Sequence, residues 1–218
     1  MSDFNIARKN MIHNQLMTNN IVEDYILKAF KVIPREIFLP FEHKPKAYLD
    51  EDIEIMTDRY LIEPRIIGNI IKLSKIKKNH VVMDLACSTG YSSAILSKLS
   101  KKVYGVDNKT KLLEQACSNI KKLNINNICF LNKKPIDGLK KKFDIIFIFG
   151  GVQYIPNNLL DSLKNDGAML ITVLYDNYDV GKVHIIKKLN GKIFRTNYIN
   201  AQTPILKDFQ KTKKEFTL

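Results

Sequence analysis

The stretch VVMDLACSTGY, residues 81–91, decides the fold of this 218-residue chain. Strand-forming apolar residues lead into Asp84, a turn of small residues follows, and a helical pattern begins at Tyr91. This order of strand, tight turn and helix N-terminus is how a doubly wound α/β fold holds a nucleotide-like cofactor. Of the three turn positions that commonly hold glycine, only Gly90 does, because Ala86 and Ser88 occupy the other two. The stretch therefore predicts an α/β fold with a cofactor site at this turn.

From residue 79 onward the chain alternates between strand and helix patterns. We expect strands over 81–85, 102–106, 127–131, 144–149 and 168–174, with helices over 92–100, 109–123 and 156–163 between them. Such an alternation indicates a parallel sheet with helices on both faces. Two further strands on either side of Asn190-Gly191 predict a hairpin at the sheet edge. Residues 79–218 thus predict a doubly wound, mostly parallel, seven-stranded Rossmann-like sheet.

Residues 1–78 predict a small helical extension followed by a loop region. We expect, in order, two helices within 6–32 that break at Asn19-Asn20, an irregular segment over 33–40, an acidic irregular connector over 47–54 and a helix that begins at Pro64. We expect this extension and the sheet domain to form one structural unit. At the other end of the chain, the apolar residues of 204–209 and 216–218 predict a tail that packs back on the domain.

The composition indicates a cytoplasmic protein. No apolar run approaches the roughly 20 residues that span a bilayer, and residues 1–5 do not begin an export signal. Cys87, Cys117 and Cys129 lack Cys-x-x-Cys spacing, so we expect reduced thiols and no metal site. The formal net charge is +13. Because the excess is almost all lysine in scattered short runs, the charge by itself does not favour a nucleic-acid partner.

A second acidic residue, Asp107, ends the second expected strand. It follows the first turn by about 20 residues, the distance at which a carboxylate accepts the ribose hydroxyls of a cofactor. The alternative is that Asp107 caps the helix that starts near Lys109. Ala86 and Ser88 would crowd a pyrophosphate, and Asp84 suits a cation better than a phosphate. These features favour S-adenosylmethionine, which carries an ammonium and a sulfonium but no phosphate.

The run DLACSTGY over 84–91 resembles the first motif of class I S-adenosylmethionine-dependent methyltransferases, D/E-x-G-x-G-x-G. Other segments are similar to protein-L-isoaspartate O-methyltransferases: RKNMI-x-x-QL (8–16), VIPRE-x-FLP (32–40), AY (47–48), FDII (143–146) and IP-x-x-LL-x-x-L-x-x-x-G (155–167). Their order and spacing cover most of residues 7–175. The resemblance implies protein repair, in which S-adenosylmethionine is the cofactor and a protein or peptide bearing isoaspartate receives a methyl ester on its carboxylate.

The resemblance also implies which residues bind the cofactor. The candidates are Asp84, Ala86, Cys87, Ser88, Thr89 and Gly90 for the methionine end, Asp107 for the ribose, and Gly150 near the methionine moiety. Ile62 and Asn108 are further candidates for cofactor binding. The family usually places an acid after the third strand to bind the adenine amino group. Here that region reads NKKP over 132–135, and the nearest acid is Asp137.

The loop before Pro64 departs from the family's usual G-x-T-I-S-x-P, whose serine contacts the reacting centre. This chain has MTDRYLIEP over 56–64, which places Ile62 at the serine position and resembles a bacterial branch with R-Y-L-x-E-P. We therefore take Arg59, Tyr60 and Glu63 as the candidate catalytic residues. Arg59 is expected to clamp an anion and to pair with Glu63, and Tyr60 to form a lid. The alternative is that Arg59 and Tyr60 lie in a surface turn.

Two other functions stay open at this point. One is a methyltransferase with a different acceptor, either a small molecule or RNA. The other is a non-catalytic protein that binds the cofactor or a partner, which the missing loop serine, the missing adenine acid and the two missing glycines favour.

Overall fold

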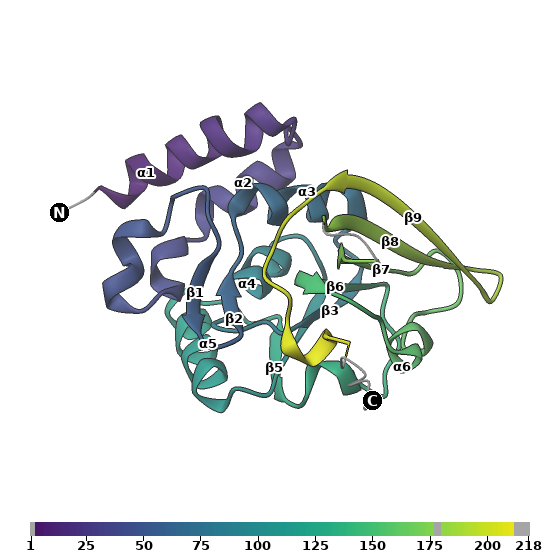
Figure 1. Ribbon diagram of the computed structural model, residues 1–218. Coiled ribbons are helices and arrows are strands. Elements are labelled where there is room, and N and C mark those ends of the chain that lie inside the picture. The colour runs from purple at the N-terminus through teal and green to yellow at the C-terminus, as the bar shows by residue number, and fades with distance from the viewer. Residues whose placement is uncertain (1–2, 177–179, 212–218) are drawn as a thin grey trace, which may run out of the picture.

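A seven-stranded sheet forms the centre of the computed structural model, which describes residues 3–176 and 180–211 (Figure 1). The strands are β3 Val81–Leu85, β4 Lys102–Asp107, β5 Ile128–Asn132, β6 Ile145–Val152, β7 Met169–Leu174, β8 Lys182–Leu189 and β9 Lys192–Asn200. Their order across the sheet is β5-β4-β3-β6-β7-β8-β9. The first five are parallel, and β8 and β9 are antiparallel to their neighbours. The predicted doubly wound fold with a closing hairpin is therefore confirmed.

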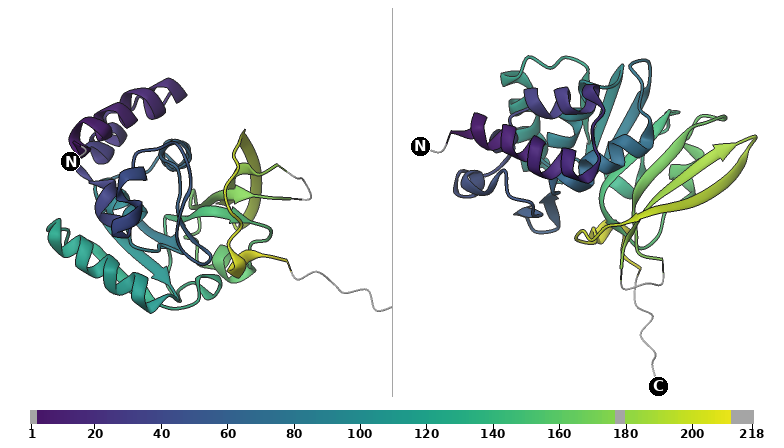
Figure 2. Two further views of the ribbon diagram at one scale, coloured as in Figure 1. Left: turned by 60° about the vertical axis from the view of Figure 1, so that its left-hand side comes forward. Right: turned by 90° about the horizontal axis from the view of Figure 1, so that it is seen from above.

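Alternate residues of the central strands supply two separate cores, as the period of a strand requires. Val82 and Phe147 belong to one hydrophobic cluster, which also contains Leu16, Phe30, Ile67 and Ile95 from the helices over that face. Met83 and Ile146 belong to the other, together with Leu159, Leu206 and Phe209. Figure 2 shows the β8–β9 hairpin at the opposite end of the sheet from the long helix α5. Because the first cluster includes residues from the N-terminal 78 and from the sheet, the two regions share one core.

The helices of the sheet region are α4 Tyr91–Ser97, α5 Thr110–Lys122 and α6 Asn157–Asp161. Helix α6 is shorter than the expected 156–163. It ends early because the next two residues pair with Phe143, which precedes β6. The backbone N–H of Phe143 donates to the carbonyl of Ser162 (2.9 Å), and Leu163 forms a β-bridge with Phe143. The proposed boundary between residues 78 and 79 stays a prediction.

The N-terminal extension contains α1 Phe4–Met11, α2 Asp24–Val32 and α3 Pro64–Ser74. After α1 the chain continues as a π-helical turn, Ile12–Leu16, and a 3-10 turn, Met17–Asn19. Asn20 then adopts a left-handed conformation with φ of 60° and ends the helical run. The predicted break at Asn19-Asn20 is confirmed. Two further 3-10 segments, Arg35–Phe38 and Phe41–Lys46, follow α2.

A short antiparallel hairpin was not predicted from the sequence. Strands β1 Ile53–Met56 and β2 Arg59–Leu61 pair where we expected an irregular connector and a loop. Ile53 and Leu61 face each other and are buried, which ties the hairpin to the core. The strands are too short to show a clear alternation, and the turn carries Asp58 at φ of 68° rather than glycine. Because of these two features, the sequence pattern does not predict the hairpin.

The C-terminal strap, residues 201–211, runs across the carboxyl end of the sheet (Figure 1). Gly151 of β6 donates its N–H to Pro204 (2.9 Å) and accepts from the N–H of Leu206 (2.9 Å). Leu206 and Phe209 are buried, so the prediction that 204–209 packs back on the domain is confirmed. Residues 216–218, for which the same was predicted, lie outside the described residues. Within the described ranges, no helix is both long and apolar enough to cross a membrane.

Candidate functional site

The turn after β3 keeps the backbone conformation that glycine favours at all three positions. Ala86, Ser88 and Gly90 have φ of 57°, 52° and 88°, respectively. A left-handed conformation costs a residue with a Cβ about 1–2 kcal/mol, so two residues in this turn are held under local strain. At Gly90 a Cβ would lie 2.9 Å from Phe130, which leaves no room for a side chain. The turn is therefore shaped like a glycine-rich cofactor loop although only one glycine is present.

We expect Ala86→Gly to stabilise the protein by roughly 0.5 kcal/mol. The gain is the left-handed strain removed, of about 1–2 kcal/mol, less the extra chain entropy of glycine, of roughly 0.5–1 kcal/mol. Urea unfolding measures the change. Ala94→Gly in the middle of α4 is the matched control, because Ala94 is helical and buried and the same replacement should destabilise there. A loss of stability in both variants would contradict the strain at Ala86.

Asp84 lies beneath this turn and is fully buried. Its Oδ2 accepts hydrogen bonds from the hydroxyls of Ser92 (2.7 Å) and Ser93 (2.6 Å), while its Oδ1 has no partner among the residues that the structure describes. Burial raises the pKa of this carboxyl to about 7, the two serine hydrogen bonds oppose that rise, and the charge of Asp107 adds to it. Asp84 is thus a buried acceptor with one free oxygen, which suits a cationic donor.

Asp107 ends β4 next to Asp84 and is also fully buried. Its Oδ2 accepts from the N–H of Ser88 (2.9 Å), and its Oδ1 accepts from the N–H of Lys109 (3.1 Å). The second bond, from the N–H of Lys109, is the contact expected if Asp107 caps the helix that starts near Lys109. The first bond ties Asp107 to the turn after β3, so the carboxylate bridges the two loops at which the cofactor was expected.

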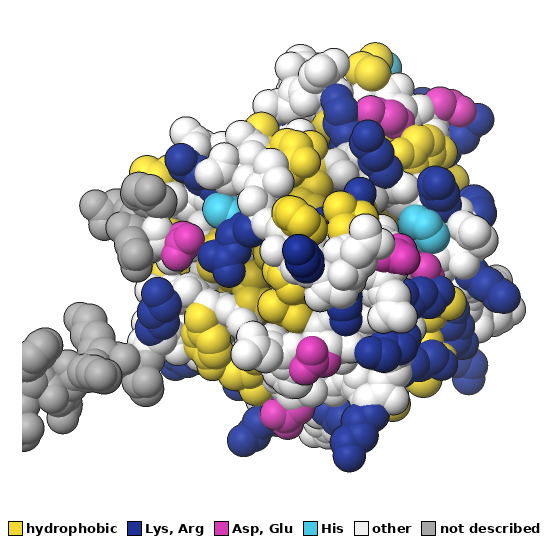
Figure 3. All heavy atoms as spheres, turned by 90° about the vertical axis from the view of Figure 1, so that its right-hand side faces the viewer, with side chains coloured by type: hydrophobic (Ala, Val, Ile, Leu, Met, Phe, Trp, Pro, Cys, Tyr) yellow, Lys and Arg dark blue, Asp and Glu magenta, His cyan; other side chains and the backbone are white. Residues whose placement is uncertain are grey.

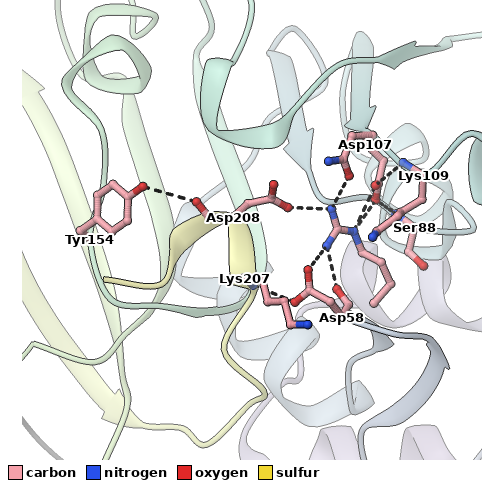
Figure 4. A network of polar contacts seen from close by, with 9 residues as sticks. Asp58, Ser88, Asp107, Lys109, Tyr154, Lys207 and Asp208 are labelled. Atoms are coloured by element: carbon pink, nitrogen blue, oxygen red, sulfur yellow. Dashed lines mark hydrogen bonds and ion pairs between the residues drawn. The ribbon is translucent and has the colours of Figure 1, made fainter. Parts of the chain in front are cut away.

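Arg59 occupies the remaining acceptor capacity of Asp107, and the contacts between them belong to the polar network drawn in Figure 4. Its Nε donates to Oδ1 (3.1 Å) and Oδ2 (2.9 Å) of that carboxylate. Its Nη1 donates to the carbonyl (2.7 Å) and Oδ2 (2.9 Å) of Asp58, and its Nη2 donates to Asn108 Oδ1 (3.0 Å) and Asp208 Oδ2 (2.8 Å). An arginine has five N–H donors, and these contacts use all of them.

The structure contradicts two expectations for the loop before Pro64 and leaves the others as predictions. Arg59 is 0% exposed, so it does not lie in a surface turn. The expected Arg59–Glu63 pair is wrong: Glu63 pairs with Arg65, which follows two residues later at the start of α3, while Arg59 at the hairpin tip turns toward β4. Burial raises the pKa of Glu63 despite the neighbouring Arg65. The catalytic roles of Arg59, Tyr60 and Glu63 stay predictions.

A cavity of about 20 Å³ lies between the hairpin and the turn after β3. Its lining includes Tyr60, Ile62, Phe149, Tyr91 and residues 86–89. The Ser88 Oγ and the Tyr91 hydroxyl in its wall have no hydrogen-bond partner within the described chain. Small-molecule pockets measure about 300–1,000 Å³, whereas this cavity would hold about one water molecule. The polar groups fit a cofactor with a charged amino-acid end, but the cavity is too small for it, with residues 60–62 forming part of its wall.

The remaining residues expected near the cofactor make contacts within the protein. Asn108 contacts Arg59. Gly150 lies on β6 under the strap, where a Cβ would come within 3.0 Å of Leu206. At the end expected to hold adenine, Asn132 donates to Thr110 (2.9 Å), and Asp137 closes the 3-10 turn Pro135–Asp137.

Several residues of the site were not found from the sequence. Arg35 is fully buried and donates from Nε to the Ala47 carbonyl (2.7 Å) and from Nη2 to the Ile62 carbonyl (2.9 Å), so it fixes the loop before α3. In the sequence, its Pro-Arg-Glu segment is visible only as part of the family resemblance. Asp58 and Asp208 had no signal, because their partner Arg59 is adjacent to one and 149 residues from the other.

Comparison with known proteins gives a family match over nearly the whole chain. The model of the protein-L-isoaspartate(D-aspartate) O-methyltransferase family matches residues 6–202. A protein-L-isoaspartate O-methyltransferase of Koribacter versatilis is 26% identical over 90% of this chain and 88% of its own length. Protein-L-isoaspartate O-methyltransferase 2 of Shewanella sediminis is 30% identical over 76% of this chain and 68% of its own length.

Two solved structures have the same fold. One is a protein-L-isoaspartate O-methyltransferase with a TM-score of 0.77 and 22% identity, of which this chain spans 65%. The other is described as a putative protein-L-isoaspartate O-methyltransferase of Plasmodium falciparum in complex with S-adenosyl-L-homocysteine, with a TM-score of 0.78 and 21% identity over 92% of this chain and 98% of that one. At this level of identity the two structures support the fold alone.

Proposed function

This chain belongs to the protein-L-isoaspartate(D-aspartate) O-methyltransferase family, and from that premise we propose that it methylates the free carboxylate of L-isoaspartyl residues with S-adenosylmethionine. The match over residues 6–202 carries this proposal. The substrate is a protein or peptide that has suffered isoaspartate formation, and the role is protein repair in the cytoplasm.

The residues around the turn after β3 fit this cofactor. The Oδ1 of buried Asp84, which has no partner among the described residues, would accept from the ammonium, and Asp107 would accept from the ribose hydroxyls once Arg59 has left it. Residues 86–89 of the turn line the cavity, and Ile62 also lines it. When bound, the cofactor supplies a methyl group activated by a sulfonium.

The protein's own tasks in this reaction are positioning and the exclusion of water. A substrate carboxylate is already ionised near neutral pH, so it needs no general base. Tyr60, Ile62 and Phe149 give the cavity an apolar wall that would keep the reacting groups dry. We propose that Arg59, Tyr60 and Glu63 contact the substrate side. For Arg59 this requires that it first leave its internal partners.

A transfer assay with methyl-labelled S-adenosylmethionine tests the function. We expect label on a peptide that contains L-isoaspartate, little on the matched aspartyl peptide, and release of the label by mild base, because a methyl ester hydrolyses readily. Label on RNA alone would replace the proposed acceptor. Binding of S-adenosylhomocysteine without transfer to either would indicate a non-catalytic protein.

The face of the molecule drawn in Figure 3 gives RNA no particular support. On the face drawn in Figure 3, the Lys and Arg side chains of the described residues are interspersed with acidic, hydrophobic and other side chains rather than joined in one basic stripe. Recognition of a phosphate backbone favours such a stripe. The isoaspartyl peptide is therefore the first acceptor to test.

A further inference from the structure

The carboxylate of Asp107 has no acceptor site to spare in this structure. A carboxylate offers about four lone-pair positions. Here Ser88 N–H and one contact from Arg59 Nε use Oδ2, while Lys109 N–H and the other Nε contact use Oδ1. The two backbone donors belong to the loops that build the site. Arg59 is the only one of the three donors whose side chain could leave without unfolding a loop.

We propose that Arg59 and the ribose of the cofactor compete for Asp107, so that the tip of the β1–β2 hairpin is a plug that must withdraw before the cofactor binds. This inference rests on the proposed function. The cavity of about 20 Å³ is the space that withdrawal would enlarge, because Tyr60 and Ile62, which follow Arg59 in the chain, form part of its wall.

The C-terminal strap holds the plug in place. Asp208 Oδ2 accepts from Arg59 Nη2 (2.8 Å), and the backbone N–H of Lys207 donates to Asp58 Oδ1 (2.7 Å) (Figure 4). The strap is itself tied to the residue that follows β6: Gln153 donates its N–H to the Phe209 carbonyl (2.9 Å). Segments far apart in the chain thus meet at one guanidinium, and the strength of the strap's hold sets the fraction of molecules with an open site.

This arrangement makes cofactor affinity depend on residues that do not touch the cofactor. The apparent Kd of a ligand equals its intrinsic Kd divided by the fraction of protein in the binding-competent state. Weakening the plug should therefore tighten binding. Loss of an ordinary structural contact would weaken cofactor binding or leave it unchanged, because that loss would loosen the site.

Titration calorimetry of the full chain with S-adenosylhomocysteine tests the plug. We expect Asp208→Ala to lower the Kd about ten- to hundredfold, since it removes a charge-assisted hydrogen bond from the closed form only. Asp176→Ala, which removes the exposed ion pair with Arg195 away from the site, should leave the Kd unchanged.

A second pair of variants separates the backbone bond from the side chain. Lys207→Pro removes the N–H that donates to Asp58 at the first position of a 3-10 turn, where proline is tolerated. Lys207→Ala removes the same side chain and keeps the N–H. Tighter binding by the proline variant alone supports the plug. Amide hydrogen exchange should also speed up over residues 57–61 in Asp208→Ala without ligand.

Two results would overturn the inference, and they are distinguishable. If the wild type binds and Asp208→Ala and Lys207→Pro bind with equal or weaker affinity, Arg59 does not compete and the proposed function stands. If neither the wild type nor any variant binds S-adenosylhomocysteine while all remain folded, the proposed function fails together with the plug.

Discussion

Replacing Asp107 by asparagine is expected to remove most of the affinity for S-adenosylhomocysteine and to lower the free energy of unfolding by about 3 kcal/mol. Removing one partner of a buried ion pair typically costs about 3–5 kcal/mol, because the other charge stays buried. We take the lower end because Arg59 keeps Asp58 and Asp208. The loss of affinity follows because the amide offers one acceptor oxygen where the carboxylate offers two.

Calorimetry and urea unfolding measure the two effects of Asp107→Asn separately. Asp24→Asn is the control, since it breaks an exposed pair with Lys28 that should contribute no more than about 0.5 kcal/mol. A variant with reduced stability and unchanged affinity would leave Asp107 only the structural role of joining Arg59, Ser88 and Lys109. Unchanged stability would contradict the buried pair itself.

Replacing Asp84 by asparagine is expected to change how stability depends on pH. The pKa of Asp84 is about 7 in the folded protein, whereas an unfolded aspartate titrates near 3.9. Between these values the folded state holds a proton that the unfolded state has released. The contribution of Asp84 to stability is therefore present below about pH 4 and is lost as the pH rises toward 7.

The pH dependence that Asp84 contributes is large enough to be measured although other carboxyl groups also titrate. Each pH unit in this window corresponds to about 1.4 kcal/mol, which gives up to about 4 kcal/mol in total. We expect the wild type to lose stability relative to Asp84→Asn as the pH is raised from 4 to 7, with a constant difference above that. Urea unfolding at several pH values gives the difference directly.

Asp144→Asn provides the control of opposite sign. The hydrogen bond from Lys164 and that from the N–H of Val81 hold the pKa of Asp144 below its usual value although partial burial opposes them. Its contribution is present above the unfolded pKa and is lost as the pH falls. A difference between wild type and Asp84→Asn that does not vary with pH would contradict the raised pKa, and with it the unpartnered buried Oδ1.

The largest elements and the acids at their ends were predictable because their signals are local. Strand β3 and the turn after it follow from one apolar run that ends in small residues, and the positions of Asp84 and Asp107 follow from where two strands end. Parallel strands bring those ends to the same edge of a sheet. The closing β8–β9 hairpin was also predictable, since Asn190-Gly191 is a strong turn signal.

The sequence by itself determined the α/β fold, the family and the edge of the sheet at which the site lies. Only the tertiary structure decided that Arg59 faces Asp107, 48 residues away, and Asp208, 149 residues away, rather than Glu63 in the same loop. The physical reason is that periodicity and turn chemistry act over a few residues. The partners of a buried charge are chosen instead by which loops the packed core brings together and by the high cost of leaving that charge unpaired.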